Sequence, residues 1–165
     1  MTGEARAYGG GTVTGPHRPT VIVSSMASDS HTWNLVYLEL LVGELGFDVV
    51  NLGACVPDEL LESECLSRRP AMLVLSSVNG HGHQDGLRVI QRLRALEELR
   101  ELPVVIGGKL GIGGGLTAEE TAQLLLAGFD AVFDDHQGAS SFRRFAATLP
   151  GGAARLSARV EGAGA

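Results

Sequence analysis

Residues 21–34 read VIVSSMASDSHTWN, and this stretch decides the fold. An apolar run over 21–23 passes into a polar turn that carries Asp29 and His31 two residues apart, and a helical pattern follows the turn. In open α/β sheets, ligands bind beyond the carboxyl ends of the strands, which is where such a turn lies. The stretch therefore predicts the first strand and the first ligand-binding loop of an α/β domain.

Short apolar runs alternate with helical patterns along the rest of the chain. Strands are expected over 20–26, 47–52, 71–76, 103–106 and 130–133, and helices over about 32–45, 59–67, 84–99, 118–127 and 139–148. The run over 71–76 is almost uninterrupted, which is typical of a central strand covered on both faces. Such alternation builds a parallel sheet with helices on both sides. The sequence predicts a flavodoxin-like (Rossmann-like), doubly wound α/β fold with five parallel strands in the order 2-1-3-4-5.

This strand order determines where a ligand is expected to bind. Its topological switch point lies between the first and third strands, and ligands of open α/β sheets bind at such points. The loops after strands one, three and four span 28–34, 76–83 and 107–116, and we expect them to meet at one edge of the sheet.

Length and composition indicate one domain, which we expect over residues 20–149 of the 165, with 44% hydrophobic content. Residues 1–19 and 150–165 are rich in Gly, Ala and Pro, which predicts a flexible extension at each end. A net charge of −6 without a basic cluster argues against binding to nucleic acid. No segment has the length and apolar character of a membrane span or a signal peptide, so we expect a cytoplasmic protein that does not bind membranes.

Cysteine and histidine spacing gives no independent metal site. Cys55 and Cys65 form no CxxC motif, and we expect two free, buried thiols. His81 and His83 lie close together after the third strand, but no third ligand has convincing spacing. We expect these two histidines to be exposed loop residues.

Two ligand classes that use this fold can be compared on the loop residues. A phosphate-accepting receiver domain needs an aspartate at the end of the third strand, where this chain has Ser76 and Ser77, so this class is excluded. An FMN-binding flavodoxin would hold phosphate in a first loop rich in Ser and Thr, and this loop offers Ser24, Ser25, Ser28, Ser30 and Thr32. The later loops carry mostly Gly and His instead of the aromatic side chains that usually sandwich a flavin. FMN binding stays open as an alternative on these grounds.

Three motifs carry a family resemblance: Asp29-Ser30-His31, Ser76-Ser77-Val78 and Gly107-Gly108. In their order and placement they resemble the signature of B12-binding domains, which is D-x-H-x-x-G after the first strand, S-x-L after the third and G-G after the fourth. The resemblance extends over about 20–149. Within the family, the short stand-alone form and the segment 76–82 are most similar to the small subunits of glutamate mutase (methylaspartate mutase).

The resemblance implies a cofactor-binding role for each loop. His31 would be the axial ligand of cobalt after the dimethylbenzimidazole base of cobalamin leaves the metal, and Asp29 would accept the other ring N–H. Ser76 would form a hydrogen bond in a slot for the displaced nucleotide tail, with Val78 as part of its wall. The remaining implied cofactor-binding residues are Ser28, Ser30, Thr32, Gly80, Gly107 and Gly108.

The implied function is that of an isomerase subunit. The chain would hold adenosylcobalamin, and a large TIM-barrel mutase subunit would hold the substrate in a hetero-oligomer that rearranges L-glutamate to 3-methylaspartate. No acid–base residue of the reaction is expected on this chain, which would be inactive alone. A non-enzymatic cobalamin carrier or sensor is the alternative within the family.

Two positions depart from the family's pattern. Asn34 stands where the first motif has glycine, and Val78 replaces the leucine of the second motif. Asparagine tolerates a positive φ better than most residues, but its side chain adds volume. We therefore expect contacts with the cofactor to differ at Asn34 and at the neighbouring Trp33.

Overall fold

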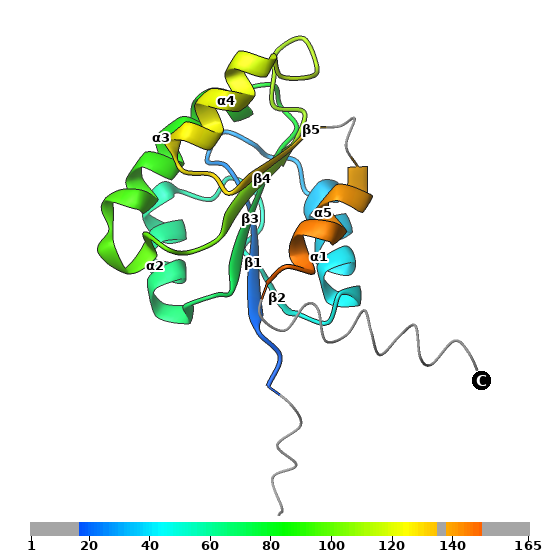
Figure 1. The fold of residues 1–165 in the computed structure, drawn as a ribbon, viewed down its shortest axis with the longest axis vertical. Coiled ribbons are helices and arrows are strands. Elements are labelled where there is room, and N and C mark those ends of the chain that lie inside the picture. The colour runs from blue at the N-terminus through cyan, green and yellow to red at the C-terminus, as the bar shows by residue number, and fades with distance from the viewer. Residues whose placement is uncertain (1–16, 135–137, 150–165) are drawn as a thin grey trace, which may run out of the picture.

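The computed structural model describes residues 17–134 and 138–149, and these residues form one five-stranded parallel sheet with helices on both faces (Figure 1). The strands are β1 (Thr20–Ser25), β2 (Asp48–Asn51), β3 (Met72–Ser77), β4 (Val104–Gly108) and β5 (Ala131–Asp134). The helices are α1 (Trp33–Glu44), α2 (Asp58–Arg68), α3 (Gly82–Ala95), α4 (Ala118–Ala127) and α5 (Gly138–Ala146), with a short 3₁₀ helix, η1 (Glu97–Leu99), after α3. The order β2-β1-β3-β4-β5 confirms the predicted fold class and topology.

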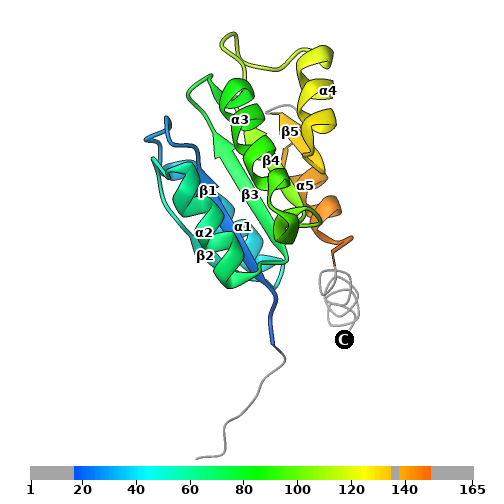
Figure 2. The same ribbon diagram turned by 90° about the vertical axis from the view of Figure 1, so that its left-hand side faces the viewer.

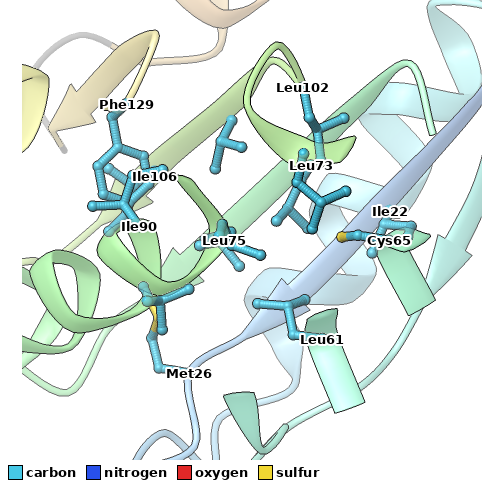
Figure 3. Packing of buried hydrophobic residues seen from close by; sticks show 14 of the residues in the cluster. Ile22, Met26, Leu61, Cys65, Leu73, Leu75, Ile90, Leu102, Ile106 and Phe129 are labelled. Carbon is cyan, nitrogen blue, oxygen red and sulfur yellow. The ribbon is translucent and has the colours of Figure 1, made fainter. Parts of the chain in front are cut away.

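Strand β3 lies at the centre of the sheet and is buried along its whole length. Its alternating side chains enter two separate cores, as the period of two along a strand requires. Leu73 and Leu75 pack in the core beneath α2, α3 and α4, part of which is drawn in Figure 3. Met72 and Val74 pack in the core beneath α1 and α5. The uninterrupted apolar run thus has the physical cause that the sequence indicated, burial on both faces.

The structure differs from the predicted elements mainly around the loops. Helix α3 begins at Gly82, where a loop was expected, and the N–H of Asp85 donates to the carbonyl of His81 in its first turn. The helix ends at Ala95 because Leu96 has extended backbone geometry, and the expected last turn is η1 instead. Strand β4 continues through the two glycines that the prediction placed in the following loop.

The predictions for the chain ends and for the two cysteines are compared with the structure next to the elements that they adjoin. The predicted flexible segments lie outside the described residues, except that 17–19 lead into β1. Cys55 and Cys65 are both free, as expected, but only Cys65 is buried, and the expected burial of Cys55 was wrong because it lies exposed in the loop after β2. Burial raises the pKa of the Cys65 thiol to about 12, with a smaller contribution from the charge of Glu64, so this thiol is unreactive at neutral pH. Among the described residues, none of the helices combines the length and hydropathy needed to cross a bilayer.

Gly108 is a strict geometric requirement where β4 ends beside β3. Its φ is +110°, and a Cβ at this position would lie 2.2 Å from the carbonyl oxygen of Ser77, its partner in the sheet. Since the obstacle is backbone, it cannot move aside as a flexible side chain would.

We expect Gly108→Ala to lower the free energy of unfolding by at least about 2 kcal/mol, because positive φ and the clash with Ser77 act together. Gly113→Ala is the matched control, since a Cβ at Gly113 meets nothing within 4 Å. We expect it to change stability by less than about 0.5 kcal/mol. Urea unfolding followed by circular dichroism measures both, and a Gly108→Ala protein as stable as the wild type would contradict the geometry.

Candidate functional site

The loops after β1, β3 and β4 meet at the carboxyl edge of the sheet, as predicted. In Figure 2 this is the upper end of the strands, opposite the end at which the chain enters β1. The N–H of Gly80 donates to the carbonyl of Lys109 at 3.3 Å, and that of His83 donates to the carbonyl of Leu110 at 3.1 Å. The N–H of Cys55 donates to the carbonyl of Asp29 at 2.9 Å and ties the loop after β2 to the same edge.

Asp29 is the centre of this edge, and its side chain is fully buried. One carboxylate oxygen, Oδ1, accepts from the backbone N–H of His31 at 3.0 Å and lies 2.7 Å from Nδ1 of the same histidine. The other, Oδ2, accepts from the backbone N–H of Val78 at 2.7 Å. A single carboxylate therefore orients the imidazole of His31 and fixes the loop after β1 to the loop after β3.

Burial alone would raise the pKa of Asp29, because a charged carboxylate loses its hydration. The backbone N–H groups of His31 and Val78, together with the imidazole of His31, outweigh this effect, and the pKa of Asp29 lies below its ordinary value. Asp29 is therefore ionised at neutral pH.

His31 carries its own metal-binding capacity on the remaining ring nitrogen. Asp29 occupies Nδ1, which leaves Nε2 as the available ligand atom, and the side chain is 48% exposed. A carboxylate on the second nitrogen is the usual arrangement behind a metal-ligating histidine. In the part of the chain that the structure describes, no cluster of three or more His, Cys, Asp or Glu residues could hold a free metal ion. The site thus offers one oriented ligand, which suits a metal already held by a larger organic group.

A cavity of about 250 Å³ opens beside this edge, between the sheet and helices α1 and α5. Its lining is mainly apolar and comes from Leu38, Leu41, Val74, Val105, Phe133 and Phe142. Val78, Gly107 and Gly108 lie where the cavity reaches the ends of β3 and β4. This cavity, called the slot below, is a mainly apolar space that extends inward from the ligand edge.

Asn34 and Ser76 contribute polar side-chain atoms to the cavity lining. The Nδ2 of Asn34 donates to the Oγ of Ser76 at 2.6 Å, and both residues are buried. The Oδ1 of Asn34 has no hydrogen-bond partner among the described residues. The residue that replaces the family's glycine is thus directly part of the slot.

A second polar network fixes the loop after β1 from the other side. The Oγ of Ser28 donates to Asp85, a buried carboxylate in the first turn of α3 that also pairs with Arg88. The amide of Asn79 donates to both the carbonyl and the Oγ of Ser28 at 3.0 Å. Ser28 was predicted as a site residue from the sequence, whereas Asn79 and Asp85 were not. Their spacing along the chain gave no signal for a network that forms only when α3 packs beside the loop.

The other predicted site residues lie in the loops at the ligand edge. Ser30 and Thr32 are exposed at the ligand edge, and Gly80 lies in the loop after β3 with φ of +83°.

His81 is exposed, as expected, but the expectation that His83 is also an exposed loop residue was wrong. Because α3 begins earlier than predicted, His83 lies in its first turn and is half-buried, and its Nε2 has no hydrogen-bond partner among the described residues.

Comparison with known proteins places this geometry in a family. The B12 binding domain family matches residues 19–141. Glutamate mutase sigma subunit 1 of Haloarcula marismortui is 33% identical over 125 residues, which are 74% of this chain and 80% of that protein. Sigma subunit 2 of the same organism is 35% identical over 117 residues, covering 70% of this chain and 76% of that protein.

Solved structures support the fold. A cobalamin-binding protein from Desulfitobacterium hafniense has a TM-score of 0.60 at 19% identity, covering 77% of this chain and 58% of that chain. The chemotaxis protein CheY4 of Vibrio cholerae has a TM-score of 0.58 at only 9% identity, covering 78% of this chain and 96% of that chain. The fold is therefore shared with proteins of other function, whereas the sequence match favours cobalamin over FMN. The chain belongs to the family of B12-binding domains, and within that family it resembles the sigma subunits of glutamate mutase.

Proposed function

We propose that this chain is the cobalamin-binding subunit of an adenosylcobalamin-dependent carbon-skeleton mutase of the glutamate mutase type. The observation that carries the proposal is the Asp29–His31 pair, with the free Nε2 of His31 beside an apolar slot. Its similarity to proteins named as glutamate mutase sigma subunits supports the choice of reaction.

The residues at the edge fit the group that the family implies. A corrin ring would bring its cobalt with it, so the protein would need to add one ligand, and His31 is the oriented candidate. The apolar slot suits the nucleotide tail of a cobalamin whose own base has left the metal. Ser76, Val78, Gly107 and Gly108 line this slot, and Ser28, Ser30, Thr32 and Gly80 lie in the loops at its edge. When bound, adenosylcobalamin supplies radical chemistry through its cobalt–carbon bond.

In this proposal the chain's own residues bind the cofactor and orient the imidazole of His31. Asp29, held ionised by its hydrogen bonds, keeps a proton on Nδ1 of His31 and thereby leaves the lone pair of Nε2 for the metal. Val78 secures Asp29 through its backbone N–H. Helices α1 and α5 exclude water from the slot through their apolar side chains.

The substrate site belongs to a second, larger chain in this proposal. Within the described residues no carboxylate, imidazole or amine lines the slot, and its one ionisable side chain is the phenol of Tyr37, to which we assign no acid–base role. A TIM-barrel mutase subunit would hold L-glutamate, with its conversion to 3-methylaspartate at the interface. The partner's position would be over the exposed edge that carries His31.

The first prediction concerns the metal ligand. Protein labelled with ¹⁵N-histidine should change the nitrogen superhyperfine splitting in the EPR spectrum of bound cob(II)alamin, because a protein imidazole then replaces the cofactor's base. His31→Ala should abolish this change, whereas His81→Ala, at an exposed histidine of the same edge, should preserve it. Retention of the dimethylbenzimidazole nitrogen on cobalt in the wild type would overturn the assignment.

A second prediction concerns Asp29 and pH. Asp29→Asn should lower the free energy of unfolding at pH 7 by about 2 kcal/mol, because an amide has one acceptor oxygen and its NH₂ would face a backbone N–H. A depressed native pKa stabilises the fold above the unfolded-state pKa near 4, and this stabilisation is lost as pH falls through the native pKa.

Urea titrations of wild type and Asp29→Asn between pH 7 and pH 3 test this. The difference in free energy of unfolding between the two proteins should become smaller as the pH falls below about 4. Asp48→Asn removes an exposed carboxylate and should leave stability within about 0.5 kcal/mol at every pH. If the difference in free energy of unfolding between wild type and Asp29→Asn stays constant with pH, the charge of Asp29 contributes nothing to stability.

A third prediction separates a mutase subunit from a carrier or sensor. The chain alone, loaded with adenosylcobalamin, should not convert glutamate, and addition of a glutamate mutase large subunit should produce 3-methylaspartate. The His31→Ala variant should reduce turnover even at saturating cofactor. Cofactor binding without turnover in the presence of the large subunit would favour the carrier or sensor.

A further inference from the structure

The Asn34–Ser76 pair has unused hydrogen-bonding capacity inside the slot. Asn34 is only 5% exposed, its Nδ2 donates one hydrogen bond to Ser76, and its Oδ1 has no partner among the described residues. Ser76 accepts from Asn34, and its own hydroxyl hydrogen forms no hydrogen bond within that part of the chain. Both residues line the cavity. A buried, unpaired polar atom is costly, which makes this pair a place where a ligand gains by supplying the missing partner.

The pair presents an acceptor with a donor beside it. In the orientation found, Asn34 Oδ1 is the acceptor and the Ser76 hydroxyl is the donor. If the amide oxygen and nitrogen of Asn34 exchange places, Ser76 donates to the oxygen, and Nδ2 becomes the donor beside a Ser76 lone pair. The requirement is the same in both cases: a ligand edge that has an acceptor next to a donor.

The remainder of the slot restricts the ligand to a flat ring system. The rest of its lining is mainly apolar, and its volume of about 250 Å³ exceeds the roughly 150 Å³ of a protein cavity that binds benzene. A bicyclic heteroaromatic base fits this description. Dimethylbenzimidazole released from cobalt offers an acceptor nitrogen but no donor, so it would leave the pair's acceptor unpaired.

Adenine offers both functions, since its N6 amino group lies next to the acceptor N1 of the six-membered ring, an edge that stays free when the two imidazole nitrogens serve the ribose and the cobalt. We propose that Asn34 makes this chain selective for corrinoids whose lower base carries a donor beside an acceptor, as adenine does, over those with dimethylbenzimidazole. This inference rests on the proposed binding of the nucleotide tail in the slot. It assigns to Asn34 a role that the family's glycine cannot have.

A purely structural role for Asn34 makes a different prediction. If its hydrogen bond only ties α1 to β3, substitution weakens the slot for every lower base alike. The decisive quantity is therefore a ratio of affinities, not an affinity. The ease with which each base leaves cobalt also differs between corrinoids, but this difference is the same for every variant and cancels when ratios are compared.

The test measures dissociation constants of three corrinoids by spectroscopic titration: one with adenine as lower base, one with dimethylbenzimidazole, and cobinamide, which has no nucleotide tail. They are titrated into wild type, Asn34→Gly and the control Val36→Ala, which alters an exposed residue of the same helix outside the slot lining. The preference of the wild type for the adenine corrinoid should fall about tenfold in Asn34→Gly and stay unchanged in Val36→Ala. Affinity for cobinamide should be the same in all three proteins.

Each other outcome overturns a specific step. An unchanged ratio in Asn34→Gly, with both corrinoids still bound, overturns the role of Asn34 and leaves the proposed function intact. Failure of the wild type to bind any of the three corrinoids overturns the proposed function itself. Should Asn34→Gly not fold, Ser76→Ala removes the other half of the pair and is expected to lower the same ratio, and an unchanged ratio there overturns the inference equally.

Discussion

The buried carboxylate of Asp29 is the interaction on which the rest of the site depends. It accepts hydrogen bonds from the backbone of two loops that lie 49 residues apart in the chain, and it orients the imidazole of His31 with the same group of atoms. A neutral side chain could not satisfy three donors in this arrangement. The fold therefore uses one ionised group both to join the loops of its ligand edge and to orient the imidazole of His31.

The architecture separates two tasks on one face of the sheet. The exposed edge offers a single oriented nitrogen, and the interior between α1 and α5 offers an apolar slot with a polar pair in its wall. Among the described residues, the edge lacks the additional ligands that a free metal needs, and no carboxylate, imidazole or amine lines the slot. Both features are expected of a chain that holds a large cofactor for chemistry completed on another subunit.

The sequence predicted the sheet and the ligand edge because both follow from local patterns. The run over 71–76 and the spacing of Asp29 and His31 are visible without any knowledge of tertiary contacts. The Asn34–Ser76 bond and the Ser28–Asp85 bond could not be read in this way, because each joins residues more than 40 positions apart that meet only after α1 and α3 pack. Gly82 looked like part of a loop, yet it begins α3 where a Cβ would lie 2.5 Å from Leu110. These features depend on packing between distant parts of the chain, and local sequence patterns do not predict them.

The most direct test of the account is a crystal structure of the chain grown with cobalamin. The account predicts that Nε2 of His31 ligates the cobalt, that Asp29 keeps its contact with Nδ1, and that the nucleotide tail extends between α1 and α5 beside Ser76. A cobalamin that retains its own base on cobalt, or whose tail lies outside this slot, would contradict it.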